Sequence, residues 1–210
     1  MPNERSPTAG LPAPIPSRLA QRLRAVLHEL PPDGLPARAL VARLGSDAVW
    51  LALLLLGAAS LVPSPGIPLG IVSGGAIALL AAHLLSGARD LPGMVARRRV
   101  PHRPLAALIP RLAPWIERAE GYLRPRLAPL SAPGMVRPWA VLILVQGILI
   151  ALPIPLGNPL PGLAVAVLAL GLMRRDGLAL LAGLFCCVLA AAWAAGVAVL
   201  GTEVVGRLLA

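Results

Sequence analysis

The stretch that decides the fold is "ALPIPLGNPLPG", residues 151 to 162, which lies between two uncharged apolar segments. It holds four prolines, two glycines and one asparagine. Because proline lacks a backbone N–H and interrupts a helix, the apolar sequence on each side is expected to form a separate helix. The stretch is therefore predicted to be the tip of a helical hairpin with arms from Trp139 to Leu152 and from Leu160 to Met173.

A second stretch, "VPSPGIPLG" at residues 62 to 70, has the same character. It joins the apolar segments Ala48 to Val62 and Leu69 to Leu85. If one inserted residue is allowed, its prolines and glycine align with those of the later tip: Pro63, Pro65, Gly66 and Pro68 with Pro153, Pro155, Gly157 and Pro159. We infer an internal duplication of a helix–break–helix unit.

Neither tip carries a charge, and the arms are short. An arm of 14 or 15 residues reaches about 22 Å, less than the roughly 30 Å hydrocarbon core of a bilayer. We therefore predict re-entrant hairpins whose tips shelter each other, since freed backbone groups must be buried in protein or line a polar cavity. The alternative is an ordinary tight turn at the far surface between short spanning helices. Only the last apolar segment, Leu178 to Leu200, is long enough to span comfortably.

The composition also indicates a membrane protein. The chain of 210 residues is 57% apolar and 13% charged, which is too apolar for a soluble fold of this size. All 19 basic residues are arginine, the net charge is +10, and the arginines flank the apolar segments. This pattern predicts a lipid bilayer as partner, with the arginine-bearing segments on the cytoplasmic side. Nucleic acid is excluded as a partner because few aromatic residues are present to stack on bases.

The predicted fold is an all-α integral membrane protein with two repeated proline-broken hairpins, interfacial amphipathic helices and one C-terminal transmembrane helix. The expected divisions are a disordered N-terminus at 1–16, amphipathic helices at 17–47, the first hairpin at 48–88, a basic interfacial linker at 89–138, the second hairpin at 139–176 and the last helix at 177–210. Within 17–47, a second short helix is expected from Pro36 to Leu44, and the linker helix is expected to be kinked at Pro110 and Pro114. Residues expected at the membrane interface are Arg97, Arg98, Arg99, Trp115, Arg124 and Arg126.

The candidate ligand-binding residues lie at the two tips: Asn158, Gly157, Pro153, Pro155, Pro63, Pro65 and Gly66. The amide of Asn158 offers donors and acceptors to a head group or sugar, but it serves equally to cap a half-helix. Gln146 is expected to bridge the hairpins, because polar side chains hold helices together in lipid. Gly66, Gly70 and Gly74, at four-residue spacing, would allow a close helix crossing.

The sequence assigns no catalytic residue, no metal and no cofactor. His28, His83 and His102 lie on different segments without the spacing of a metal site. A chain without lysine has no lysine-bearing phosphate loop, and the adjacent Cys186 and Cys187 are interpreted as small core residues. Asp176, directly before the last helix, is interpreted as its N-cap.

Three quoted pieces then resemble one family: "LVPSPGIPLG", "APWIERAEGYLRPRL" and "LPIPLGNPLPGLAVAVLALGLMRRDGLALLAGL". In this order and spacing, over about residues 20 to 205, the chain resembles the ExoD family of bacterial exopolysaccharide synthesis proteins. Its most specific pieces are residues 124–127, residues 153–158, and Gly171-Leu172 followed by residues 175–177. Ser64 departs from the apolar residue expected in the first tip.

The resemblance implies a multi-pass protein of the bacterial inner membrane that is needed for exopolysaccharide production or regulates it. The resemblance does not indicate that the protein catalyses any particular reaction. The expected role is transport or assembly without catalysis, with other exopolysaccharide-synthesis membrane proteins or a second copy of the chain as candidate partners. Two alternatives stay open: a transporter of lipids or small solutes, and an enzyme acting on lipid-linked sugars.

Overall fold

A computed structural model describes residues 19–29, 31, 34–36, 47–61, 69–88, 92–93, 97, 99–100, 102–152 and 157–209. The expected disordered N-terminus, the prolines of the first tip, Pro153, Pro155, Gly66 and Arg98 lie outside these residues. The α-helices are α1 (Leu19–His28), α3 (Ala48–Ala59), α4 (Leu69–Leu85), α6 (His102–Tyr122), α7 (Val136–Ala151), α8 (Pro159–Arg174) and α9 (Gly177–Leu209). Two 3₁₀ turns, η2 (Ala128–Ser131) and η3 (Pro133–Met135), precede α7.

One short strand pairing interrupts this helical architecture. Strands β1 (Leu35–Pro36) and β2 (Arg99–Val100) pair antiparallel, with Leu35 opposite Val100 and Pro36 opposite Arg99. The expectation of a helix beginning at Pro36 is wrong at that residue, because a contact with the linker sets the local conformation there. The rest of that expected helix lies outside the described residues.

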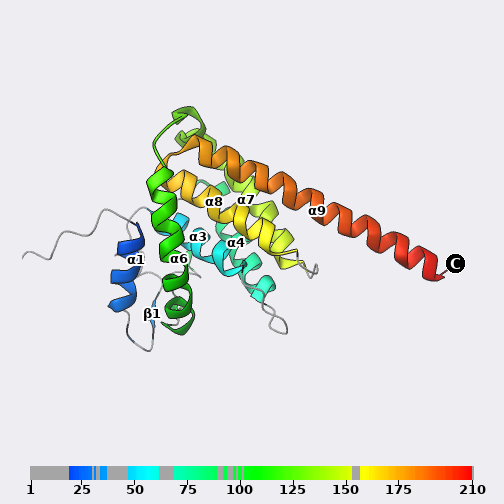
Figure 1. Cartoon of the computed structure of the whole chain (residues 1–210), viewed down its shortest axis with the longest axis horizontal. Helices are drawn as coiled ribbons and strands as arrows, with labels where there is room; N and C mark the ends of the chain where they lie inside the picture. Colours follow the sequence, from blue (N-terminus) through cyan, green and yellow to red (C-terminus); the bar gives the residue numbers. More distant parts are fainter. Residues whose placement is uncertain are drawn as a thin grey trace, which may run out of the picture.

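The centre of the molecule is a bundle of α3, α4, α7 and α8 (Figure 1). Helix α4 packs along α7, and α3 packs along α8, so each arm of one hairpin contacts an arm of the other. Helices α3 and α4 are apolar on all sides, as expected of helices without a water-facing side. Their core side chains include Leu53 and Ile77, packed with Ile143 and Leu168 of the second hairpin.

Glycines allow the two hairpins to approach closely. A Cβ atom on Gly74 would lie 2.5 Å from the carbonyl oxygen of Gly147, and one on Gly57 would lie 2.7 Å from that of Gly162. Real Cβ atoms do not come this close to backbone, so these positions require glycine. The prediction of a close crossing at Gly74 is confirmed.

Helix α9 packs along α8 and then continues well beyond the bundle (Figure 1). Its segment Gly177–Gly201 is long and apolar enough to cross a membrane, and so is Pro133–Ala151, which comprises η3 and α7. The expectation that only the last segment reaches spanning length is therefore wrong. Residues 136–138 continue the second hairpin's first arm, because Pro138 lies in the first turn of α7, where a missing N–H is tolerated.

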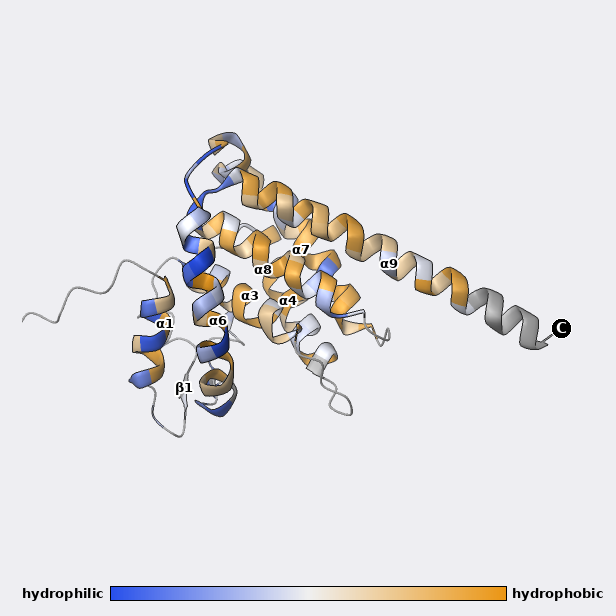
Figure 2. Cartoon of the chain, in the orientation of Figure 1, coloured by the Kyte–Doolittle hydropathy of each residue, from blue (hydrophilic) through white to orange (hydrophobic). Residues whose placement is uncertain are grey.

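Helices α1 and α6 lie against each other at one end of the bundle, and they and the segment after α6 hold most of the hydrophilic residues coloured blue in Figure 2 (Figures 1 and 2). Helix α1 buries Leu19, Leu23 and Val26, and α6 buries Ile109 and Ile116 in the same core. The apolar side of α1 thus packs on protein. Helix α6 continues through Pro110 and Pro114 without a break.

Candidate functional site

The described ends of the two hairpins meet in a group of small and polar residues, which we call the tip cluster: Ser60, Gly70, Ser73, Asn158 and Gly162. Ser60 follows α3, Gly70 and Ser73 lie in the first turns of α4, and Asn158 precedes α8. The hydroxyls of Ser60 and Ser73 are buried and lie 3.0 Å apart. A Cβ atom on Gly70 would lie 2.6 Å from Nδ2 of Asn158, so the two hairpins touch at this level.

Two buried oxygens of the second hairpin lack a hydrogen-bond partner in the described structure: Oδ1 of Asn158, at this contact, and Oε1 of Gln146 on α7. Asn158 is the N-cap residue of α8, but its side chain makes no capping hydrogen bond. Only its backbone oxygen is used, accepting from the N–H of Gly162 at 3.0 Å. Gln146 is 1% exposed and lies on α7, which packs against α4 of the other hairpin, yet its oxygen does not form the expected bridge.

A buried polar atom without a partner costs about 1 to 3 kcal/mol. The tip cluster therefore contains one acceptor, Oδ1 of Asn158, that a hydroxyl or ammonium group could satisfy, and Oε1 of Gln146 is a second such acceptor on α7. Of the other ligand-binding residues predicted from the sequence, Gly157 is buried next to Asn158, and the prolines and Gly66 lie outside the described residues.

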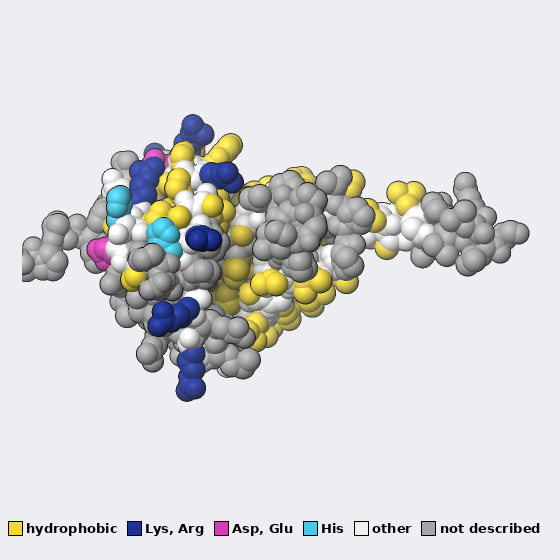
Figure 3. Space-filling model, turned by 90° about the horizontal axis from the view of Figure 1, so that it is seen from below, with side chains coloured by type: hydrophobic (Ala, Val, Ile, Leu, Met, Phe, Trp, Pro, Cys, Tyr) yellow, Lys and Arg dark blue, Asp and Glu magenta, His cyan; other side chains and the backbone are white. Residues whose placement is uncertain are grey.

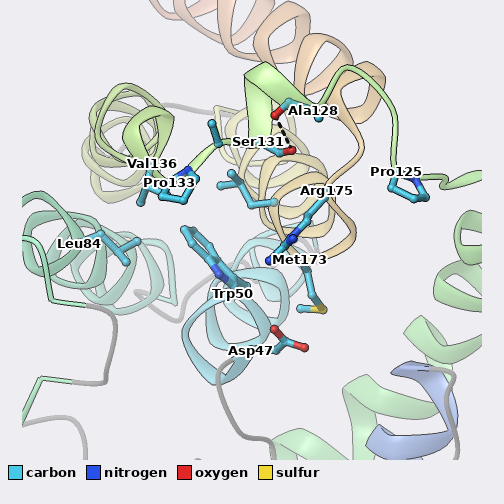
Figure 4. A pocket seen from close by; sticks show the side chains of 12 residues that line it. Asp47, Trp50, Leu84, Pro125, Ala128, Ser131, Pro133, Val136, Met173 and Arg175 are labelled. Carbon is cyan, nitrogen blue, oxygen red and sulfur yellow. Dashed lines mark hydrogen bonds between the residues drawn. The ribbon is translucent and has the colours of Figure 1, made fainter.

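A cavity lies at the opposite end of the bundle from the tip cluster (Figure 4). This basal cavity has a volume of about 620 Å³ and is partly open. Helix ends far apart in the sequence form its walls, with η2 and η3 beside them. They include Asp47, Trp50, Leu84, Ser131, Pro133, Val136, Met173 and Arg175. The sequence analysis placed a small polar cavity near Asn158 instead and did not predict this one.

The polar walls of the basal cavity come from Asp47, Ser131 and Arg175. Arg175 has a left-handed backbone conformation with φ 54°, which is uncommon for a residue with a side chain. In Figure 4, Trp50 stands between Leu84 on one side and Met173 and Arg175 on the other. The walls thus combine one cation, one carboxylate, one hydroxyl and an aromatic ring with apolar side chains.

Asp176, next to Arg175, holds the base of the bundle together. Its carboxylate has no exposed surface and accepts hydrogen bonds from Nε of Arg126 at 2.9 Å and from the backbone N–H of Arg124 at 3.0 Å. It also accepts the N–H groups of Leu178 and Ala179, which confirms the predicted N-cap of α9. Burial by itself raises the pKa of this carboxyl, but the hydrogen bonds from Arg126 and the three backbone N–H groups lower it to about 2.

Arginine and glutamate pairs connect the other elements at this end. Arg24 of α1 pairs with Glu117 of α6 at 2.7 Å, and Arg174 of α8 pairs with Glu120 of α6. Glu120 also accepts the backbone N–H of Leu19 at 2.8 Å. These two glutamates therefore join α1, α6 and α8. Within the described residues, no three histidine, cysteine or acidic side chains come together as a metal site would require.

The arginines visible in Figure 3 gather at this end of the molecule, as the sequence analysis expected, and the visible histidines lie there too. Trp115 is 68% exposed, and the guanidinium of Arg118 lies 5.6 Å from its ring centre. The predicted interface residues Arg97, Arg99, Arg124 and Arg126 are exposed. Arg126 has an additional role that the sequence did not reveal, since its Nε is bound to Asp176.

These features define a class: a helical-bundle protein with a basic end, two mutually packed hairpins, and two helices long and apolar enough to cross a membrane. A family model described as "Exopolysaccharide synthesis, ExoD" matches residues 19–196, and the chain belongs to this family. Protein ExoD of Rhizobium meliloti (strain 1021) is 29% identical over 174 residues, which cover 80% of this chain and 72% of that protein. No solved structure matches the chain.

Proposed function

We propose that this ExoD-family chain is a multi-pass protein of the bacterial inner membrane that supports exopolysaccharide production in a transport or assembly role, without being an enzyme. Three properties support the membrane placement: the family, the two long apolar helices, and the arginine-rich end opposite the hairpin tips. In this placement the basic end faces the cytoplasm, where anionic lipids and the positive-inside rule favour it.

The lengths of α3 and α8 favour re-entrant hairpins, although α7 together with η3 reaches the length of a membrane span. The apolar segment Gly177–Gly201 of α9 has 25 residues, or about 37 Å, and spans the hydrocarbon core. Helix α3 with 12 residues extends about 18 Å, and α8 with 16 residues about 24 Å. Because α9 begins where α8 ends, the tip of the second hairpin lies part-way along α9, at membrane depth.

The packing of the two hairpins also favours duplication. Gly57 of α3 meets Gly162 of α8, and Gly147 of α7 meets Gly74 of α4. Gly147 follows Gly57 by nearly the same interval as Gly162 follows Gly74. We interpret the hairpins as two repeats in which the first arm of each hairpin packs against the second arm of the other. Broken helices in repeated halves are the sequence feature that most often indicates a transport site.

The observation that carries the proposal is the buried contact between the hairpins at Asn158, together with the unsatisfied oxygens of Asn158 and of Gln146 on α7. A polar solute with hydroxyl or ammonium donors would satisfy them inside an otherwise apolar bundle. Asn158 and Gly157, with Pro153, Pro155, Pro63, Pro65 and Gly66, remain the proposed ligand-binding residues.

Complementation combined with a flux measurement tests this proposal. A strain lacking its own family member should regain polysaccharide output with the wild-type chain and lose it with Asn158→Ala at equal membrane abundance. Purified wild-type protein in proteoliposomes should then move a lipid or a polyprenyl-linked sugar. Complementation without any flux would favour an assembly role over transport. Failure of the wild-type chain to complement would contradict the proposal.

An independent lipid or small-solute transporter is the second candidate, since the same buried contact would form its site. Flux of such a substrate without any effect on polysaccharide output would favour it. The enzyme alternative needs a paired acid and base. It would gain support if alanine at Asp47, Asp90, Glu120 or Asp176 removed polysaccharide output while the variant protein stayed folded.

A further inference from the structure

The basal cavity carries two opposite charges that the protein does not pair with each other. Within the described part of the chain, neither the carboxylate of Asp47 nor the guanidinium of Arg175 forms an ion pair or a hydrogen bond. Asp47 interacts electrostatically with Arg174, but the ion pair of Arg174 is with Glu120. The cavity therefore offers one anionic and one cationic group on different walls, from the start of α3 and the end of α8.

The backbone holds Arg175 in place at the rim. Its left-handed conformation follows the last turn of α8, and its N–H donates to the carbonyl oxygen of Gly171. The buried carboxylate of Asp176 fixes the next residue. A glycine would adopt this conformation without strain, so the arginine is retained here at some conformational cost.

Apart from Ser131, the remaining walls are mainly apolar. Leu84, Val136 and Met173 line the cavity together with the ring of Trp50. The helix ends that line the cavity lie where the apolar bundle meets the hydrophilic end of the molecule (Figure 2). In the proposed membrane placement, this is the level of the lipid head groups on the cytoplasmic side. A volume of about 620 Å³ is typical of small-molecule sites.

We propose that the basal cavity binds the head group of a zwitterionic phospholipid of the phosphoethanolamine type. Arg175 binds the phosphate, Asp47 accepts hydrogen bonds from the ammonium group, and the apolar walls contact the glycerol and the first acyl carbons. The pair of charges provides selectivity, because a purely anionic head group has no cationic group to place against Asp47. A choline head group carries the same charge but has no N–H to donate, so it should bind less tightly than ethanolamine.

This inference rests on the proposed membrane placement, and binding to the full-length protein in detergent tests it. Phosphatidylethanolamine, phosphatidylglycerol and phosphatidylcholine are titrated separately, and native mass spectrometry counts the bound lipids. The wild type should bind phosphatidylethanolamine about tenfold more tightly than phosphatidylglycerol, the range expected for one charge-assisted hydrogen bond. Asp47→Asn should remove this preference, and Arg175→Asn should weaken the binding of both lipids.

Asparagine suits both positions, because it is nearly isosteric with aspartate and tolerates a left-handed backbone. Arg111→Gln is the matched control, since this exposed arginine on α6 lies outside the cavity lining. It should bind lipids as the wild type does. Wild-type protein without a preference between the two lipids would overturn the inference whatever the variants do, and so would folded Asp47→Asn that keeps the preference. Wild-type protein recovered in the soluble fraction without detergent would contradict the membrane placement itself.

Discussion

Arg126 donates a 2.9 Å hydrogen bond from Nε to Oδ1 of Asp176, a carboxylate without exposed surface. The two residues are 50 positions apart in the sequence. They belong to two of the three pieces by which the sequence most resembles its family, residues 124–127 and 175–177. The backbone strengthens the contact, since the N–H of Gly177 donates to the carbonyl oxygen of Arg126 at 2.8 Å. These family motifs therefore form one structural unit that fixes the start of α9 against the segment after α6.

We predict that Asp176→Ala destabilises the protein by about 2 kcal/mol or more, because it removes a helix cap and leaves buried N–H groups without an acceptor. Thermal unfolding in detergent measures the effect. Arg124→Ala is the matched control, since Arg124 contributes only its backbone N–H to the carboxylate. It should unfold close to the wild-type temperature. Equal melting of Asp176→Ala and the wild type would show that this contact contributes nothing to stability.

The same carboxyl makes stability depend on pH. The pKa of Asp176 is about 2 in the folded protein, against an ordinary value of 3.8. Its contribution to the free energy of unfolding is therefore complete above about pH 4 and is lost as the pH falls toward 2. Denaturant unfolding at a series of pH values should show this acid loss in the wild type. Asp176→Asn should lose less stability over the same interval, because the asparagine does not titrate. Parallel pH profiles of the two proteins would contradict the prediction.

The glycines between the hairpins give a stability prediction with an adjacent control. Gly74→Ala should cost about 1 to 3 kcal/mol, since the new methyl group would lie 2.5 Å from backbone atoms of α7. Gly75→Ala on the same helix meets nothing within 4 Å and should be neutral or stabilising, because alanine favours helices over glycine. Unfolding midpoints of the two variants give the comparison. A Gly74→Ala variant as stable as Gly75→Ala would contradict the close packing of α4 on α7.

A substitution at Asn158 distinguishes a ligand-binding role of its amide from a structural role. Because its Oδ1 has no partner in the described structure, Asn158→Ala should unfold at or above the wild-type temperature while polysaccharide output falls. Ser86→Ala is a control at the other end of the bundle and outside the cavity lining, where that exposed hydroxyl donates to the carbonyl oxygen of His83. It should leave output unchanged. A large loss of stability in Asn158→Ala would indicate a structural role for the amide.

The sequence predicted the arms of both hairpins well, because their limits are set locally by apolar composition and by proline. Helix α4 begins and ends as expected, and Asp176 caps α9 as expected. The start of α7 was missed because Pro138 resembles a helix breaker but lies in the first turn of the helix.

The basal cavity could not be predicted in the same way. Its walls come from the ends of four helices that only tertiary packing brings together. The pairing of Arg126 with Asp176 also depends on long-range contact. The arginine at position 175, where a helix end would favour glycine, was the only local sign of this region, and its left-handed backbone is visible only in the structure.

The depth of the hairpin tips is the central claim, and cysteine labelling measures it directly. In a background with Cys186→Ala and Cys187→Ala, single cysteines replace Leu61 or Leu152 at the tips, Tyr122 at the basic end and Gly201 on α9. Membrane-impermeant thiol reagents should label Tyr122→Cys only from the cytoplasm and Gly201→Cys only from the periplasm. Leu61→Cys and Leu152→Cys should resist the reagent from both sides and react only after detergent opens the membrane. Free labelling of both tip cysteines from the periplasm would mean that the hairpins span the bilayer, and it would contradict the account.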